Sequence, residues 1–306
     1  MTSPRFSLPF LKAGDAVCLV SPSFKALEED VLSGIKALEN MGLRVFCGKN
    51  IFSNWGSFSG SDEERLQDLQ WALDHPDARA VLCVRGGYGM SRILPQIEWK
   101  KFQDHPKWLV GFSDISLLHM EIGRLGFPSV HGLMAARYGS AEFTESSRMM
   151  RNFLFGEMQE LRYPVRNETG SKGDIQAILW GGNLTMVAHS IGSGAESGSE
   201  DLILFLEEVG EAYYRIDRSF RQIACANTLN KRIKAVILGQ FTDCPENGFP
   251  LQISGMAAQA FSGVPVFSGL PCGHGNPNFP LVMGFPAQLE MQNQEWQLCQ
   301  YLGLDV

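Results

Sequence analysis

The chain has 306 residues, of which 44% are hydrophobic and 19% charged, so it can bury a sizeable core and is too apolar to be disordered. Its 26 basic and 33 acidic residues leave a net charge of −7 without a basic run, which argues against a nucleic-acid partner. The N-terminus lacks an apolar signal segment, and no stretch approaches the roughly 18 apolar residues of a membrane span. We therefore expect a cytoplasmic protein with no membrane partner.

Segments typical of strands and helices alternate through the first half of the chain. Four apolar runs predict strands, at residues 16–20, 44–47, 80–84 and 108–112. Helical spacing predicts a helix over 27–41, and the capping box that begins at Ser61 and includes Glu64 predicts another through Leu73. This alternation is typical of a parallel α/β sheet, and we expect an N-terminal domain over residues 1–140.

The second half begins after a region of different character, residues 141–172, which we interpret as a linker that contains a helix over 144–155 and an exposed polar turn. Beyond it we expect a smaller domain of mixed strands and helices over 173–306, in which Gly181-Gly182-Asn183 stands between a strand and a helix. Its strands are predicted at residues 175–180, 202–206 and 235–238, and its helices at about 184–191 and 214–226. The seven cysteines are scattered without a C-x-x-C pair, so we expect buried, reduced thiols.

The end of the fourth predicted strand carries a candidate nucleophile. Gly111-Phe112-Ser113 follows the apolar run, and helix-forming residues resume after it. This is the layout of a strand-turn-helix elbow, which lifts a serine hydroxyl above the edge of a parallel sheet. We expect Asp114 to cap the helix that follows. Ile115 stands where G-x-S-x-G has its second glycine, so a serine that only begins a helix is the competing interpretation.

A glycine-rich segment, Arg85-Gly86-Gly87-Tyr88-Gly89, follows the third predicted strand, and we call it the glycine loop. Closely spaced glycines let backbone N–H groups turn outward together as an anion-binding nest. The segment matches neither G-x-G-x-x-G nor the P-loop pattern, so a nucleotide cofactor is weakly supported. An oxyanion hole and a plain tight turn remain as alternatives.

The second half supplies candidates for an acid and a base. Glu207 directly follows an apolar strand, where sites of α/β folds gather, whereas the side chain of Glu208 should point to the opposite side. Of the six histidines, His274 lies in a glycine-flanked loop and is the best candidate for a general base. Cys272 and His274 lack the spacing of a zinc site, so we expect neither a metal nor a cofactor.

These segments occur together, and in the same order, in one family. The ordered set resembles the LD-carboxypeptidases, which are serine peptidases, and its members lie at residues 84–89, 111–115, 131–134, 180–184, 205–211 and 273–275. The resemblance implies a triad of Ser113 as nucleophile, Glu207 as orienting acid and His274 as base. It also implies an oxyanion hole formed by the backbone N–H groups of Gly87 and Asp114. We further expect Arg85, Trp180 and Asn183, which lie within these motifs or beside them, to bind substrate.

The same resemblance implies a fold, an activity and a substrate. The fold would be a flavodoxin-like N-terminal domain and a smaller mixed α/β C-terminal domain, in a cytoplasmic homodimer. The activity would be release of the terminal D-alanine from murein tetrapeptides during cell-wall recycling. Two alternatives stay open: an immunity peptidase that cleaves a peptide-nucleotide antibiotic of the microcin C type, and a non-catalytic module that binds an anion at the glycine loop.

Overall fold

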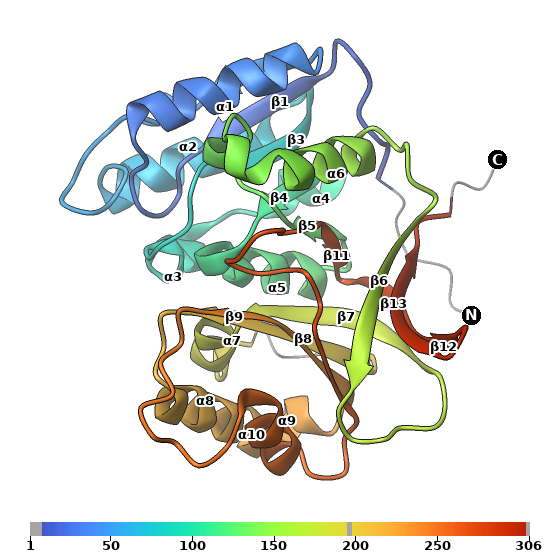
Figure 1. Ribbon diagram of the computed structural model, residues 1–306. Helices are drawn as coiled ribbons and strands as arrows, with labels where there is room; N and C mark the ends of the chain where they lie inside the picture. The colour runs from blue at the N-terminus through green and yellow to red at the C-terminus, as the bar shows by residue number, and fades with distance from the viewer. Residues whose placement is uncertain (1–7, 195–197, 304–306) are drawn as a thin grey trace.

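The computed structural model describes residues 8–194 and 198–303 and has two sheets, each with helices packed against it (Figure 1). The first sheet has six strands in the order β11-β5-β4-β3-β1-β2. Five of them are parallel to one another, and β11 is antiparallel to β5 at the edge. They span Ala16–Val20 (β1), Arg44–Cys47 (β2), Ala78–Cys83 (β3), Trp108–Gly111 (β4), Ser129–His131 (β5) and Leu281–Met283 (β11).

The helices of this part follow the strands in the predicted alternation. The main ones are α1 (Glu28–Asn40), α2 (Asp62–Asp74), α5 (Ser116–Arg124) and α6 (Thr144–Leu154), with the shorter α3 (Met90–Ile93) and α4 (Lys100–Asp104) between them. Both hydrogen bonds of the predicted capping box form: Glu64 N–H donates to Ser61 Oγ at 3.2 Å, and Ser61 N–H donates to Glu64 Oε2 at 2.8 Å. The parallel strand order β2-β1-β3-β4-β5 is the doubly wound order 2-1-3-4-5.

The second sheet is a closed barrel of seven strands in the order β10-β6-β13-β12-β7-β8-β9. Its strands are β6 (Glu160–Asn167), β7 (Ile175–Asn183), β8 (Leu202–Val209), β9 (Ile233–Thr242), β10 (Val266–Ser268), β12 (Phe285–Gln292) and β13 (Glu295–Tyr301). The helices of this part are α7 (Leu184–Ser190), α8 (Tyr213–Cys225), α9 (Asn227–Asn230) and α10 (Ile253–Ala260). The expectation of a mixed α/β domain was therefore incomplete, because it did not foresee that the sheet closes.

Two features join the halves of the molecule. Strand β11 comes from the C-terminal part of the chain but completes the N-terminal sheet, and β6 lies in the predicted linker but pairs with β13 and β10 of the barrel. Each of the two buried apolar clusters contains side chains from both sheets, such as Val17 with Phe205 in one and Val81 with Leu204 in the other. The core therefore continues from one sheet into the other.

Some local predictions were incomplete. The strand expected over residues 175–180 continues through Gly181-Gly182-Asn183 as β7, and Gly182 lies against α5: a Cβ built there would stand 2.3 Å from Ser116 Oγ. A glycine is therefore needed for this approach between β7 and the helix that follows Ser113. All seven cysteines are free thiols as expected, but Cys225 is exposed and Cys47 and Cys244 are only partly buried.

Candidate active site

Ser113 stands two residues after the end of β4, in a one-turn 3₁₀ helix that leads into α5. Its φ of 64° lies in the left-handed region, which non-glycine residues rarely adopt and which costs on the order of 1–3 kcal/mol. Such strain persists only where surrounding contacts hold it, and it is concentrated at functional sites. The backbone at Ser113 therefore has the sharp turn of a nucleophile elbow.

The glycine loop packs directly against Ser113. A Cβ built on Gly86 would lie 2.8 Å from Ser113 Cβ, and one built on Gly87, whose φ is 112°, would lie 2.4 Å from Cδ2 of Phe24. Neither position can hold a side chain without displacing its neighbours. Within the described part of the chain the Gly87 N–H donates no hydrogen bond, so it is available to an oxygen bound beside Ser113.

Glu207, on β8, and His274, in the segment after β10, form a buried pair. His274 Nδ1 donates to Glu207 Oε2 at 2.7 Å, and the side chains are 17% and 0% exposed. This bond leaves Nε2 as the ring nitrogen that can accept a proton. Glu207 Oε1 is buried without a hydrogen-bond partner among the described residues.

The electrostatics of this pair favour a protonated histidine. Burial lowers the pKa of His274, but the charge of Glu207, its hydrogen bond and the charge of Glu208 together outweigh burial and raise the pKa above its usual 6.5. An imidazolium formed at His274 is thus stabilised by the adjacent carboxylate, as a general base requires.

The two neighbouring glutamates have separate partners. Glu208 accepts hydrogen bonds from Asn183 Nδ2 at 2.8 Å, from Thr185 N–H at 2.9 Å and from Thr185 Oγ1 at 2.7 Å, so it binds the N-terminus of α7. Glu207 instead faces His274. Because successive residues of a strand point to opposite faces, only one of the pair can reach the histidine.

The ring of Phe112 brings the two halves of the site together, since its centroid lies 4.9 Å from that of His274, with the rings in an edge-to-face arrangement. Ser113 is the next residue. In the described chain no hydrogen bond joins Ser113 Oγ to His274, and catalytic bonds are often long without substrate. We predict that substrate closes this gap.

The segment around His274 is anchored more firmly than a glycine-flanked loop suggests. Gly275 N–H donates to Gln240 Oε1 at 2.8 Å, and Gly273 N–H donates to Asn278 Oδ1 at 3.1 Å. Asn278 N–H in turn donates to Ser146 Oγ of α6 at 2.9 Å. The backbone on both sides of His274 is therefore fixed to β9 and α6.

The same arrangement of sequence and fold is found in known proteins. Residues 17–132 match the model of the LD-carboxypeptidase N-terminal domain, and residues 176–289 match that of the LD-carboxypeptidase C-terminal domain. The murein tetrapeptide carboxypeptidase of Pseudomonas aeruginosa is 37% identical over 92% of this chain and 94% of its own length. This chain belongs to the LD-carboxypeptidase family.

Solved structures of related proteins have the same fold. The muramoyltetrapeptide carboxypeptidase of Oxalobacter formigenes is 26% identical, with a TM-score of 0.82 over 93% of this chain and 98% of that one. MccF in complex with glutamyl sulfamoyl guanosine has a TM-score of 0.85 over 97% and 99% of the two chains, but at 19% identity this likeness concerns the fold alone. The family resemblance inferred from the motifs is thereby confirmed.

Of the three side chains expected to bind substrate, two are buried in this LD-carboxypeptidase. Trp180 and Asn183 are 6% and 5% exposed, and the Asn183 side chain accepts from Met186 N–H and donates to Glu208. Arg85 is exposed, and its Nη1 donates to Lys25 O at 2.9 Å. The structure thus gives Trp180 and Asn183 contacts inside the protein, and their binding of substrate stays a prediction.

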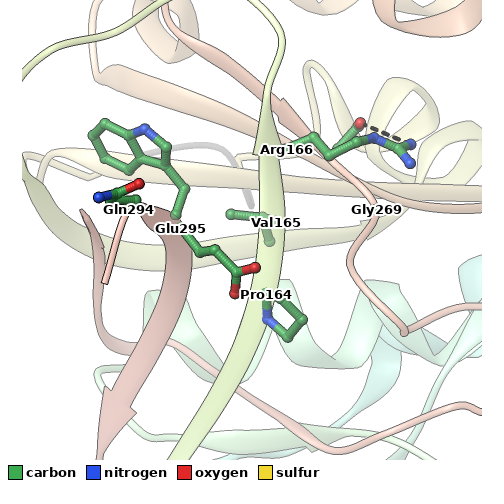
Figure 2. A pocket seen from close by; sticks show the side chains of 8 residues that line it. Pro164, Val165, Arg166, Gly269, Gln294 and Glu295 are labelled. Carbon is green, nitrogen blue, oxygen red and sulfur yellow. Dashed lines mark hydrogen bonds between the residues drawn. The ribbon is translucent and has the colours of Figure 1, made fainter. Parts of the chain in front are cut away.

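A pocket of about 370 Å³ lies elsewhere, on the barrel, and Figure 2 shows its lining side chains. They come from β6, from β10 with Gly269 after it, and from the β12–β13 hairpin, and Arg166 Nη2 donates to Ser268 Oγ there at 3.3 Å. None of the residues predicted for the active site lines it. The residues predicted for the active site lie instead in the glycine loop, after β4, on β7 and β8, and in the segment after β10.

No group of three or more His, Cys, Asp or Glu side chains in the described ranges has the geometry to hold a metal ion. In the same part of the chain, no helix is long and apolar enough to cross a membrane.

Asp114 departs from its prediction as a helix cap. Its carboxylate, 1% exposed, accepts from Met90 N–H at 2.8 Å and from Ser23 Oγ at 2.6 Å. It therefore binds the start of α3 rather than the start of α5. Ser23 and Met90 were not foreseen; the only signal for Ser23 was its position three residues after the first strand, at the edge where sites of parallel sheets gather.

Proposed function

We propose that this LD-carboxypeptidase releases the terminal D-alanine from murein tetrapeptide by a serine mechanism with Ser113, Glu207 and His274. The observation that carries the proposal is the buried Glu207–His274 pair beside a serine held at a φ of 64°. The name of the 37% identical Pseudomonas aeruginosa relative supports the substrate. The bond to be cleaved would join the L-centre of a diamino acid to D-alanine.

Acylation would begin with neutral His274 taking the proton of the Ser113 hydroxyl through Nε2 while Oγ attacks the scissile carbonyl. The carbonyl oxygen becomes an oxyanion, which the N–H groups of Gly87 and Asp114 would stabilise. His274 then gives its proton to the leaving nitrogen, and D-alanine departs with its amino group restored. Throughout this step Glu207 holds the imidazolium by charge and by the bond to Nδ1 without taking the proton.

Deacylation would use the same groups in the reverse sense. His274 takes a proton from water, the hydroxide attacks the acyl carbonyl, and Ser113 Oγ leaves and recovers its proton from His274. The shortened peptide is released with a free carboxylate. One histidine thus acts as base and then as acid in both half-reactions.

The decisive experiment incubates the purified chain with murein tetrapeptide and follows free D-alanine and the tripeptide product. Release of both, at equal amounts, is the expected result. No D-alanine, together with cleavage of an aminoacyl sulfamoyl nucleotide, would instead favour an immunity peptidase. Failure to turn over either compound, with tight binding of an anion at the glycine loop, would favour the non-catalytic module.

Three further expectations accompany the proposal. We class the N-terminal sheet as flavodoxin-like on its strand order, and we expect a homodimer in the cytoplasm. Light scattering coupled to size-exclusion chromatography tests the homodimer, because a dimer has twice the 33.9 kDa mass of the chain. Fractionation of the producing cell locates the protein.

A further inference from the structure

Two buried charged side chains hold the end of the glycine loop. Arg65 Nη1 donates to the carbonyl of Gly89 at 3.1 Å, and the Asp114 carboxylate accepts from the N–H of Met90 at 2.8 Å. Gly89, the last residue of the loop, thus accepts a hydrogen bond through its carbonyl, and the next residue, Met90, donates one through its N–H. The Arg65 side chain is 0% exposed and Asp114 is 1% exposed, so neither contact competes with water.

The Asp114 carboxylate also reaches the segment on the other side of the glycine loop. Ser23 Oγ donates to it at 2.6 Å, and the next residue, Phe24, covers Gly87 with its ring. Phe24 N–H donates to the carbonyl of Gly86 at 3.2 Å. A single carboxylate therefore ties the turn that carries Ser113 to both segments that surround Gly87.

Asp62 neutralises the buried guanidinium of this region. Asp62 forms ion pairs with Arg65 and with Arg92, the latter at 2.6 Å, and the charge of Arg65 also acts on Asp114. Both guanidinium groups thus pair with Asp62, whereas Asp114 is held by its hydrogen bonds from Ser23 and Met90. A buried charge is tolerated when it is paired and hydrogen-bonded in this way, whereas loss of one partner leaves the others uncompensated.

We propose that the Asp114 carboxylate is a positioning group that sets the distance between the two oxyanion N–H donors. One donor is the N–H of Asp114 itself, and the other, Gly87, lies in the loop that the carboxylate holds through Met90 and Ser23. The inference rests on the proposed function. Such donors act only within about 2.7–3.1 Å of the oxyanion, and a displacement of about 1 Å can cost roughly 10²-fold in rate.

The test compares Asp114→Ala with a matched variant, Asp68→Ala. Asp68 is also a buried aspartate, 5% exposed, that accepts a backbone N–H and a side-chain N–H, both from Asn50, at 2.8 and 3.0 Å. Both variants should lower the melting temperature. Only Asp114→Ala should lower kcat for murein tetrapeptide, by about 10²-fold with KM changed little, since the donors act in the transition state.

Two milder variants serve if Asp114→Ala does not fold. Ser23→Ala removes one of the two donors to the carboxylate and should lower kcat by about 10-fold, less than loss of the whole carboxylate. Asp114→Asn keeps an acceptor oxygen for Ser23 and Met90 and should recover part of the activity that alanine loses. Unchanged kcat in both milder variants overturns the inference.

A second readout separates this inference from the proposed substrate. A fluorophosphonate bonds through phosphorus to Ser113 Oγ with loss of fluoride, and its developing P–O⁻ needs the same donors whatever the natural substrate. Slower labelling of Asp114→Ala than of Asp68→Ala supports the inference even if no D-alanine is released by the wild type. Equal labelling and equal kcat overturn it even if murein tetrapeptide is hydrolysed, and a wild type that reacts with neither compound overturns both proposals.

Discussion

The two halves of the proposed site are held by different kinds of interaction. In the N-terminal half, backbone conformation decides: Ser113 has a φ of 64°, and the glycine loop lies so close that a Cβ on Gly86 would meet Ser113 Cβ at 2.8 Å. In the barrel, two side chains decide: Glu207 and His274 are joined by one hydrogen bond of 2.7 Å. Adding atoms to the backbone of the N-terminal half should therefore lower activity, and so should removing the charge in the barrel half.

The largest effect should come from removing the two groups that the halves bring together. Ser113→Ala and His274→Ala should each lower kcat by at least about 10⁴-fold while leaving the circular dichroism spectrum intact. Because the two residues act in one step, the double variant should be scarcely worse than either single one. Losses that multiply in the double variant would mean that the residues serve separate steps.

The charge of the barrel half is tested by Glu207→Gln, which keeps the shape of the side chain. We expect kcat to fall by about 10³–10⁴-fold, since the imidazolium loses its stabilising carboxylate. Glu208→Gln is the matched control, because Glu208 is buried beside it but binds Asn183 and Thr185. It should cost about 1 kcal/mol of stability and change kcat by only a few-fold. The opposite ranking of the two variants in a kinetic assay would reverse the assignment of the acid.

The backbone half is tested by adding one methyl group. Gly87→Ala places a Cβ 2.4 Å from the Phe24 ring at a φ of 112°, so the loop must shift and kcat should fall by about 10²-fold. Gly14→Ala is the control, because Gly14 has a φ of 90° but no atom within 4 Å of the added Cβ. It should cost about 1–2 kcal/mol in stability without affecting kcat. Equal kcat for the two variants would show that the position of Gly87 is not critical.

A smaller effect is expected from pH, and it reports on the charges around His274, of which Glu207 contributes more than Glu208. Because the pKa of His274 is raised above 6.5, kcat/KM should increase with pH along a titration curve whose midpoint lies above pH 6.5. Glu207→Gln should shift this midpoint to lower pH. The raised pKa contributes stability that is present below the unfolded-state value and lost as pH rises through the folded-state value. The stability difference between wild type and Glu207→Gln should therefore be larger at about pH 6 than at about pH 9. A midpoint that does not move would disconnect Glu207 from the histidine.

Chelators should leave the activity unchanged, which is the smallest effect expected. A Ser-Glu-His mechanism activates its nucleophile through a histidine and needs no metal-bound water. D-alanine release should be equal before and after dialysis against EDTA, with Ser113→Ala as the inactive reference. Loss of activity that zinc restores would contradict the serine mechanism.

Local features of the sequence determined the candidate residues and the first four strands. Ser113, Glu207 and His274 each stand beside a feature visible within a few residues: an apolar run that ends in Gly-x-Ser, an acid directly after a strand, and a histidine between glycines. The capping box at Ser61 likewise needed only residues three apart, and it formed as expected. Such signals are readable because the backbone geometry they require is set within one turn or one strand.

The barrel and the supports of the site depended on contacts between distant segments. Strands β6 and β12 have alternating burial that is typical of a strand, but such a pattern does not say which strands pair. Strand β13 pairs with β6, far away along the chain, so no local pattern predicts the closed sheet. The Asp114 carboxylate was expected at the nearest helix, and only packing placed Ser23 and Met90 N–H within its reach. The sequence thus provided the candidate groups for the proposed chemistry. The tertiary structure decided which partner each buried charge has, because a buried polar group bonds to whatever donor the fold places beside it.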